Sequence, residues 1–251
     1  MIKKLIKNTL NILLSPFDVR IVKKNEIMPN PSVLRERLFK QLILKGFYPK
    51  HILDVGAHEA EWSTDALKFF PESIFTLIEP QIEMKPYLDK FCLNAKKAKW
   101  ILAGAGATEG ELLFTLAPNS DSSSFAIEED KAAEWGTERR VLPLVTLDSV
   151  CERNSLPVPE IVKIDAEGLD LDVVKGANKL IGKTEIFFIE IPFFDYWPNQ
   201  SFYSIIQYMN ECGYVPFDIT DINRRKNDEA LALMEMAFVK KNGMFRNYHG
   251  W

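Results

Sequence analysis

The stretch His51-Ile52-Leu53-Asp54-Val55-Gly56-Ala57-His58-Glu59-Ala60 joins a short apolar run to a glycine turn. The run predicts a buried strand over residues 51–55. Residues 62–70 then have the pattern of a helix, which Pro71 ends. In open α/β sheets, ligands bind at the carboxyl ends of strands, where the strand order reverses. We therefore expect a ligand site at the turn around Gly56.

The strand and helix pattern repeats along the chain. Short apolar runs alternating with amphipathic helices predict a mostly parallel sheet covered by helices on both faces. Further strands are expected at 74–78, 100–103, 161–164 and 185–191, an exposed hairpin strand at 110–116 and an extended segment at 141–144, with helices at 84–97, 146–154, 169–181 and 202–212. The last two strands, 214–219 and 235–240, have no long helix between them and predict an antiparallel hairpin that closes a seven-stranded sheet.

The charge of the chain is divided unevenly. Residues 1–50 hold eleven Lys/Arg and three Asp/Glu, which gives them a charge of +8, whereas the whole chain of 251 residues carries −4. The rest of the chain is therefore acidic, and nucleic acid is not an expected partner. We expect an N-terminal helical extension over residues 1–49, with a helix at 33–45, followed by a single domain over residues 50–251.

Residues 1–14 form the pattern of a basic amphipathic helix. Ile2, Leu5, Ile6, Leu10, Leu13 and Leu14 recur at helical spacing, with lysines on the other face. The segment is too short and too charged to span a bilayer. Its apolar stripe suits packing on the domain or on a second subunit in a homodimer, which we favour, and also peripheral contact with an anionic membrane.

The cysteines indicate a reducing compartment. Cys92, Cys151 and Cys212 are far apart and form no C-x-x-C pair. Because no small-residue cleavage site follows the basic segment, we expect no signal peptide and a cytoplasmic location.

The turn at Gly56 suits a cofactor with a carboxylate tail. Glycine permits a tight turn, and the next helix offers free N–H groups and its positive dipole end. The methionine part of S-adenosylmethionine (SAM) fits this place, with Asp54 near its amino group and Ala57 and His58 beside it. NAD is disfavoured because His58 occupies the second glycine position of the G-x-G-x-x-G pattern.

Glu79-Pro80 follows the second predicted strand. An acidic residue about 20 positions after the glycine turn is suited to accept hydrogen bonds from two ribose hydroxyls. Gly104 and Ala105, after the third strand, complete the predicted cofactor site.

Lys163-Ile164-Asp165-Ala166-Glu167-Gly168 ends the fourth core strand and places two carboxylates at the ligand edge of the sheet. Charged groups at this place indicate a functional cleft. The structural alternative is an ion pair between Lys163 and Asp165, with Glu167 capping a helix. Glu190, in the fifth strand, adds a third carboxylate.

Together these motifs resemble the FkbM-type methyltransferase family over roughly residues 50–240. The similarity lies in Asp-Val-Gly-Ala at 54–57, Ile-Glu-Pro at 78–80, Thr-Leu-Asp at 146–148, and Lys-Ile-Asp-Ala-Glu-Gly at 163–168 with Lys-Gly-Ala at 175–177. The resemblance implies a Rossmann-like class I fold and a SAM-dependent O-methyltransferase acting on hydroxyls of sugars, glycans or polyketides. The sequence departs from the family pattern at His58 and Ala60, which replace asparagine and glycine.

Methyl transfer to an alcohol benefits from a nearby base. Asp165 is the first candidate, followed by Glu167 and Glu190. No zinc motif occurs, and Mg²⁺ is not expected, although the carboxylates are of the type that bind it. The aromatic segment 192–198 and the polar loop 119–124 are candidates for acceptor contact. Carboxyl and amine acceptors, a non-enzymatic SAM-binding protein and an NAD-dependent oxidoreductase remain as alternatives.

Overall fold

The computed structural model describes residues 31–118, 123–127, 129–197 and 200–247. The strands are β1 His51–Val55, β2 Ile74–Glu79, β3 Ala98–Leu102, β4 Gly104–Ala105, β5 Gly110–Thr115, β6 Arg139–Val145, β7 Ile161–Ile164, β8 Ile186–Pro192, β9 Tyr214–Arg224 and β10 Leu231–Lys240. The α-helices are α2 Pro31–Leu44, α3 Glu61–Phe69, α4 Lys85–Asn94, α5 Glu129–Trp135, α6 Leu147–Arg153, α7 Asp170–Lys175 and α8 Phe202–Glu211. Short 3₁₀ helices cover Ile82–Met84 and Met244–Arg246.

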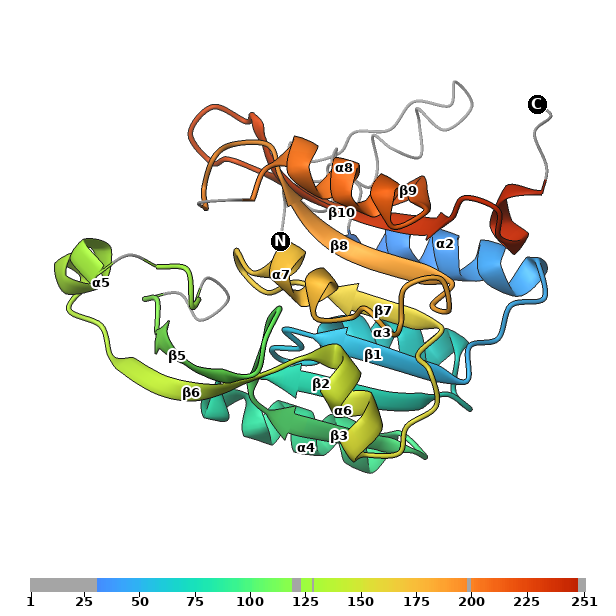
Figure 1. The fold of residues 1–251 in the computed structure, drawn as a ribbon, viewed down its shortest axis with the longest axis horizontal. Coiled ribbons are helices and arrows are strands. Elements are labelled where there is room, and N and C mark those ends of the chain that lie inside the picture. The colour runs from blue at the N-terminus through green and yellow to red at the C-terminus, as the bar shows by residue number, and fades with distance from the viewer. Residues whose placement is uncertain (1–30, 119–122, 128, 198–199, 248–251) are drawn as a thin grey trace, which may run out of the picture.

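Seven strands of the described chain form the main sheet in the order β3-β2-β1-β7-β8-β10-β9. The pairs from β3 to β8 are parallel, whereas β10 is antiparallel to both β8 and β9. Figure 1 shows helices on both faces of this sheet. The predicted α/β fold with a closing antiparallel hairpin is therefore confirmed. The strand order reverses between β1 and β7, which predicts a ligand crevice at their carboxyl ends.

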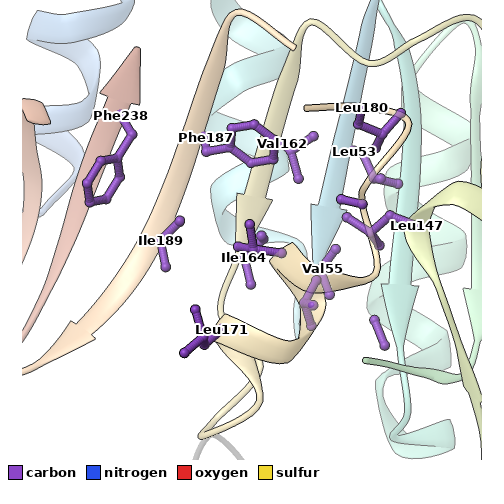
Figure 2. Close-up of a cluster of buried hydrophobic side chains, with 14 of the residues drawn as sticks. Leu53, Val55, Leu147, Val162, Ile164, Leu171, Leu180, Phe187, Ile189 and Phe238 are labelled. Carbon is purple, nitrogen blue, oxygen red and sulfur yellow. The ribbon is translucent and has the colours of Figure 1, made fainter. Parts of the chain in front are cut away.

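The sheet has a hydrophobic core on each face because successive side chains of a strand point to opposite sides. Leu53 and Val55 join one cluster with residues of α6, α7 and α8, part of which is drawn in Figure 2. Ile52 joins the other cluster with residues of α2, α3 and α4. Burying each large apolar side chain contributes roughly 1.5–3 kcal/mol, so both helix layers are held firmly against the strands that carry the crevice.

A second sheet lies beside the main one. Its described strands have the order β4-β6-β5, with β5 antiparallel to β6. In Figure 1, β5, β6 and α5 extend away to one side of the main sheet. Residues 110–116 were predicted as an exposed strand and residues 141–144 as extended, whereas the joint sheet of β5 and β6 with β4 was not predicted.

Two predicted helices are shorter in the structure. The helix expected over 169–181 ends at Lys175, and Gly176 follows as its C-cap, at a position where a side chain would lie 2.1 Å from the carbonyl oxygen of Gly106. The carbonyl of Gly176 accepts from the N–H of Asp148, and the chain continues in turns. The helix expected over 84–97 ends at Asn94, with Ala95 already extended.

The expected helix over residues 1–14 lies outside the described residues, as do residues 119–122 of the polar loop. Among the helices that the structure describes, none combines the length and the apolar character needed to cross a membrane.

Candidate functional site

A cavity of about 440 Å³ opens at the carboxyl ends of β1, β2, β7 and β8, where the strand order reverses. Of the predicted site residues, ten line it: Gly56, Ala57, His58, Glu79, Pro80, Gly104, Ala105, Asp165, Glu167 and Glu190. The remaining one, Asp54, is not part of the wall. The position of this cavity agrees with the general rule for open α/β sheets.

The close approach of the backbone at the end of β7 requires a glycine at position 56. Its φ is +68°, and a Cβ at this position would lie 1.7 Å from the carbonyl oxygen of Asp165. The N–H of Asp165 donates to the carbonyl of Val55 at 3.1 Å, which holds β1 and β7 together at this point. Gly56 therefore serves the close approach of the two strands that form the crevice, a role that the sequence analysis did not anticipate.

The turn after Gly56 has two further residues in the left-handed region. His58 has φ +45° and Ala60 has φ +59°, which is unfavourable for residues with a side chain. The N–H of His58 donates to Oε2 of Glu79 at 2.8 Å, and the N–H of Gln81 donates to Oε1 at 2.9 Å. Glu79 thus fixes the turn of β1 against the end of β2.

Glu79 is 2% exposed. Burial raises the pKa of its carboxyl to about 7, although the two backbone hydrogen bonds act in the opposite direction. Each carboxylate oxygen accepts one amide N–H and has the capacity for a further hydrogen bond, and Glu79 lines the cavity. Glu79 is therefore placed to accept hydrogen bonds from a bound diol.

Asp54 lies beneath the cavity. It is fully buried, accepts from the hydroxyl of Ser63 at 2.6 Å and lies 3.3 Å from Nζ of Lys163. The structure thus places Asp54 within a buried network rather than on the surface of the site.

Lys163 connects the two central strands. Its Nζ donates to the carbonyl of Gly56 at 2.7 Å and lies 3.3 Å from Asp54 and 3.4 Å from Asp165. Burial lowers the pKa of Lys163, but the carboxylates of Asp54 and Asp165 more than offset burial and raise it overall. The ion pair between Lys163 and Asp165, considered as an alternative from the sequence, is present and also lies in the cavity wall.

Asp165, Glu167 and Glu190 come together, each offering an oxygen within 4.8 Å of the others. Burial raises the pKa of Glu190 well above its ordinary value, and the charges of Asp165 and Glu167 add to the effect. Oε2 of Glu190 is buried and has no hydrogen-bond partner among the described residues. The group can hold a proton, and its oxygen spacing also suits a divalent cation.

The model of the methyltransferase FkbM domain matches residues 54–216. The chain belongs to the FkbM methyltransferase family. The predicted resemblance is thereby confirmed, and the protein is a methyltransferase.

Solved structures that match the chain are more distant. They include the precorrin-6y C5,15-methyltransferase of Geobacter metallireducens GS-15, with 11% identity, 81% of this chain and 88% of that chain covered, and a TM-score of 0.44. A putative RNA methyltransferase from Pyrococcus horikoshii has 13% identity, covers 84% of this chain and 83% of that chain, and has a TM-score of 0.47. No curated protein matches the sequence.

Part of the cavity wall lies outside the matched FkbM domain. Arg35 of α2 lines the cavity, as do Asp221 and Asn223 of β9 and Glu235 of β10. None of them was predicted. Arg35 carries a signal in the sequence, since it lies three, four and seven positions before the buried Leu38, Phe39 and Leu42, which places an arginine on the apolar face of its helix.

The described aromatic residues of the segment 192–198 do not line the cavity, and Trp197 lies beside the loop that carries Glu167. A side chain at Gly168 would lie 2.5 Å from Cδ1 of Trp197, so Trp197 packs on the loop that carries Glu167. Phe193, Phe194 and Tyr196 are exposed, and Phe193 packs against Phe202 at 5.0 Å between ring centroids. Of the polar loop, Ser123 lines the cavity.

Proposed function

We propose that the protein transfers the methyl group of SAM to a hydroxyl of a small molecule of the sugar, glycan or polyketide type. The observation that carries this proposal is the joint position of Glu79 and Asp165 in one cavity at the strand-order reversal. Glu79, which can accept hydrogen bonds from a ribose diol, and the carboxylate of Asp165 then lie at two sides of the same space. This is the arrangement required to bring a nucleoside donor and an alcohol together.

The donor side consists of the ends of β1 and β2. Glu79 accepts the ribose hydroxyls, and Gly104 and Ala105 border the nucleoside. The methionine part then extends along the turn of β1 towards the start of α3. SAM carries a positive sulfonium, which the acidic wall of the cavity favours.

The acceptor side consists of the ends of β7 and β8. An acceptor oxygen attacks the methyl carbon, the carbon–sulfur bond breaks, and its electron pair leaves the sulfur as a neutral thioether. The hydroxyl proton passes to a carboxylate, and Asp165 is the first candidate because its half-exposed side chain can reach an acceptor. Glu190 beside it retains a proton readily because its pKa is raised by burial.

The proposal is tested by incubating the purified protein with SAM and a panel of sugars, lipid-linked glycans and polyketides. Mass spectrometry is expected to show a product heavier by one methyl group and an equal amount of S-adenosylhomocysteine (SAH). Thermal melting with SAH and with NADH serves as the parallel binding assay. Stabilisation by NADH alone would contradict the proposal.

The affinity for SAH is expected to depend on pH through Glu79. Below a pH of about 7 the carboxyl of Glu79 takes up a proton in the free protein and loses acceptor capacity for the ribose. Because binding then requires release of this proton, the affinity should fall by up to about tenfold per pH unit on going from pH 7 to pH 5.5. Isothermal titration calorimetry across this range provides the measurement.

Two variants sharpen this prediction. Glu79→Gln should bind SAH more weakly but with a flatter pH dependence, whereas Glu72→Gln, at an exposed carboxylate paired with Lys96, should behave as the wild type. Equal wild-type affinity at pH 5.5 and pH 8 would show that Glu79 does not hold the ribose in its ionised form.

A further inference from the structure

Among the described residues that line the cavity, Lys163 and Arg35 are the lysine and arginine side chains. The two side chains differ in whether their N–H donors are already engaged by other groups of the protein. Nζ of Lys163 is already engaged by the carbonyl of Gly56 and by two carboxylates. It has no donor left for an anionic group of a ligand.

Arg35 has unused donors. It is 8% exposed, and its Nη1 donates to Oδ2 of Asp65 at 3.0 Å. Its Nε is buried and makes no hydrogen bond with the described residues. The contacts of Nε to Glu235 at 3.7 Å and of Nη2 to Asp221 at 4.0 Å are too long for hydrogen bonds. A buried donor of this kind indicates a missing partner.

We propose that Arg35 binds the carboxylate of the methionine part of SAM. The inference rests on the proposed function. The guanidinium lies beside the first turn of α3, 6.0 Å above the ring of Trp62 and bonded to Asp65 of the same helix. The first turn of α3 follows directly on the turn of β1, where the methionine part is expected.

The charges of the cavity strengthen this assignment. Asp165, Glu167 and Glu190 line the space towards β7 and β8 and repel a carboxylate. Asp221 and Glu235 lie 4.0 Å and 3.7 Å from the guanidinium of Arg35 and offset part of its charge. In the described wall, the cation of Arg35 lies beside the start of α3, where the positive end of the helix dipole also favours a carboxylate. The planar guanidinium of arginine is suited to donate hydrogen bonds to a carboxylate.

The consequence is that α2 belongs to the binding site. This helix precedes the matched residues 54–216 but is anchored by Leu38, Phe39 and Leu42, which are fully buried. Phe39 packs edge-on against Trp62 at 5.6 Å, so the packing of α2 on α3 fixes the position of Arg35.

The test pairs a change in the protein with a change in the ligand. SAH and its decarboxylated analogue, which keeps the ammonium group, are titrated calorimetrically into the wild type, Arg35→Gln and Arg37→Gln. Arg37 is a matched control because it lies on the same helix, is exposed and pairs with Asp218 at the surface. Arg35→Gln should weaken SAH binding about 10–100-fold and leave binding of the analogue within about twofold, while Arg37→Gln changes neither.

Removing Arg35 takes away one of the two cationic partners of Asp65, the other being Lys68 at 2.7 Å, so a double variant Arg35→Gln/Asp65→Asn is measured beside the single variant. Equal weakening of SAH and the analogue, or no weakening of either, overturns the assignment of Arg35. Failure of the wild type to bind both ligands would instead overturn the proposed function. The two failures are therefore distinguishable.

Discussion

Replacing Asp165 by asparagine is expected to lower the rate of methyl transfer about 10²–10⁴-fold, the usual range for loss of a general base. The substitution keeps the size of the side chain but removes its ability to accept a proton. The fold should tolerate it, because the side chain is 38% exposed and Lys163 retains Asp54 and the carbonyl of Gly56 as partners. The rate is measured as SAH formed with an acceptor found in the panel.

The affinity for SAH separates this effect from general damage. Asp165→Asn should bind SAH within a few-fold of the wild type. Asp172→Asn is a matched control, since this carboxylate is in the next helix, α7, and pairs with Lys175 at the surface. Wild-type turnover by Asp165→Asn would remove Asp165 from the proton transfer, and the same assay on Glu190→Gln would then identify the remaining candidate.

Much of the fold follows from local pattern. The run at 161–164 is a strand with the predicted limits, because its three β-branched apolar residues suit a strand buried on both faces. The end of α7 at Lys175 was not predicted, and the chain that follows it is tied to a segment distant in sequence, since the carbonyl of Gly176 accepts from the N–H of Asp148. Strands β9 and β10 also run longer than expected, to Arg224 and from Leu231, because they pair with each other beyond the core.

The site was predictable where it follows from strand order. Gly56, Glu79 and Asp165 each end or follow a parallel strand, and such ends meet at one edge of a sheet. Asp221 and Glu235 could not be placed in this way, because they lie within the hairpin, and their direction depends on a register that contains bulges. The apolar spacing of α2 places Arg35 on the buried face of its helix, but it does not specify that this face packs against α3 beside the cavity.

Replacing Gly56 by alanine is expected to destabilise the protein severely, by about 4 kcal/mol or more, which is at the upper end for single substitutions. Two costs act together. The φ of +68° is strained for alanine by roughly 1 kcal/mol. The added Cβ would also lie 1.7 Å from the carbonyl oxygen of Asp165, so β1 and β7 must separate.

Gly46→Ala isolates the first of these costs. Gly46 has φ +76°, but a Cβ there would meet nothing within 4 Å. This variant should lose only about 1 kcal/mol of unfolding free energy in urea, measured alongside Gly56→Ala. If the two variants were destabilised equally, the contact between the β1 turn and the end of β7 would not be as tight as the structure shows. Because that contact also positions Asp165, Gly56→Ala should lose SAH binding under conditions in which it remains folded.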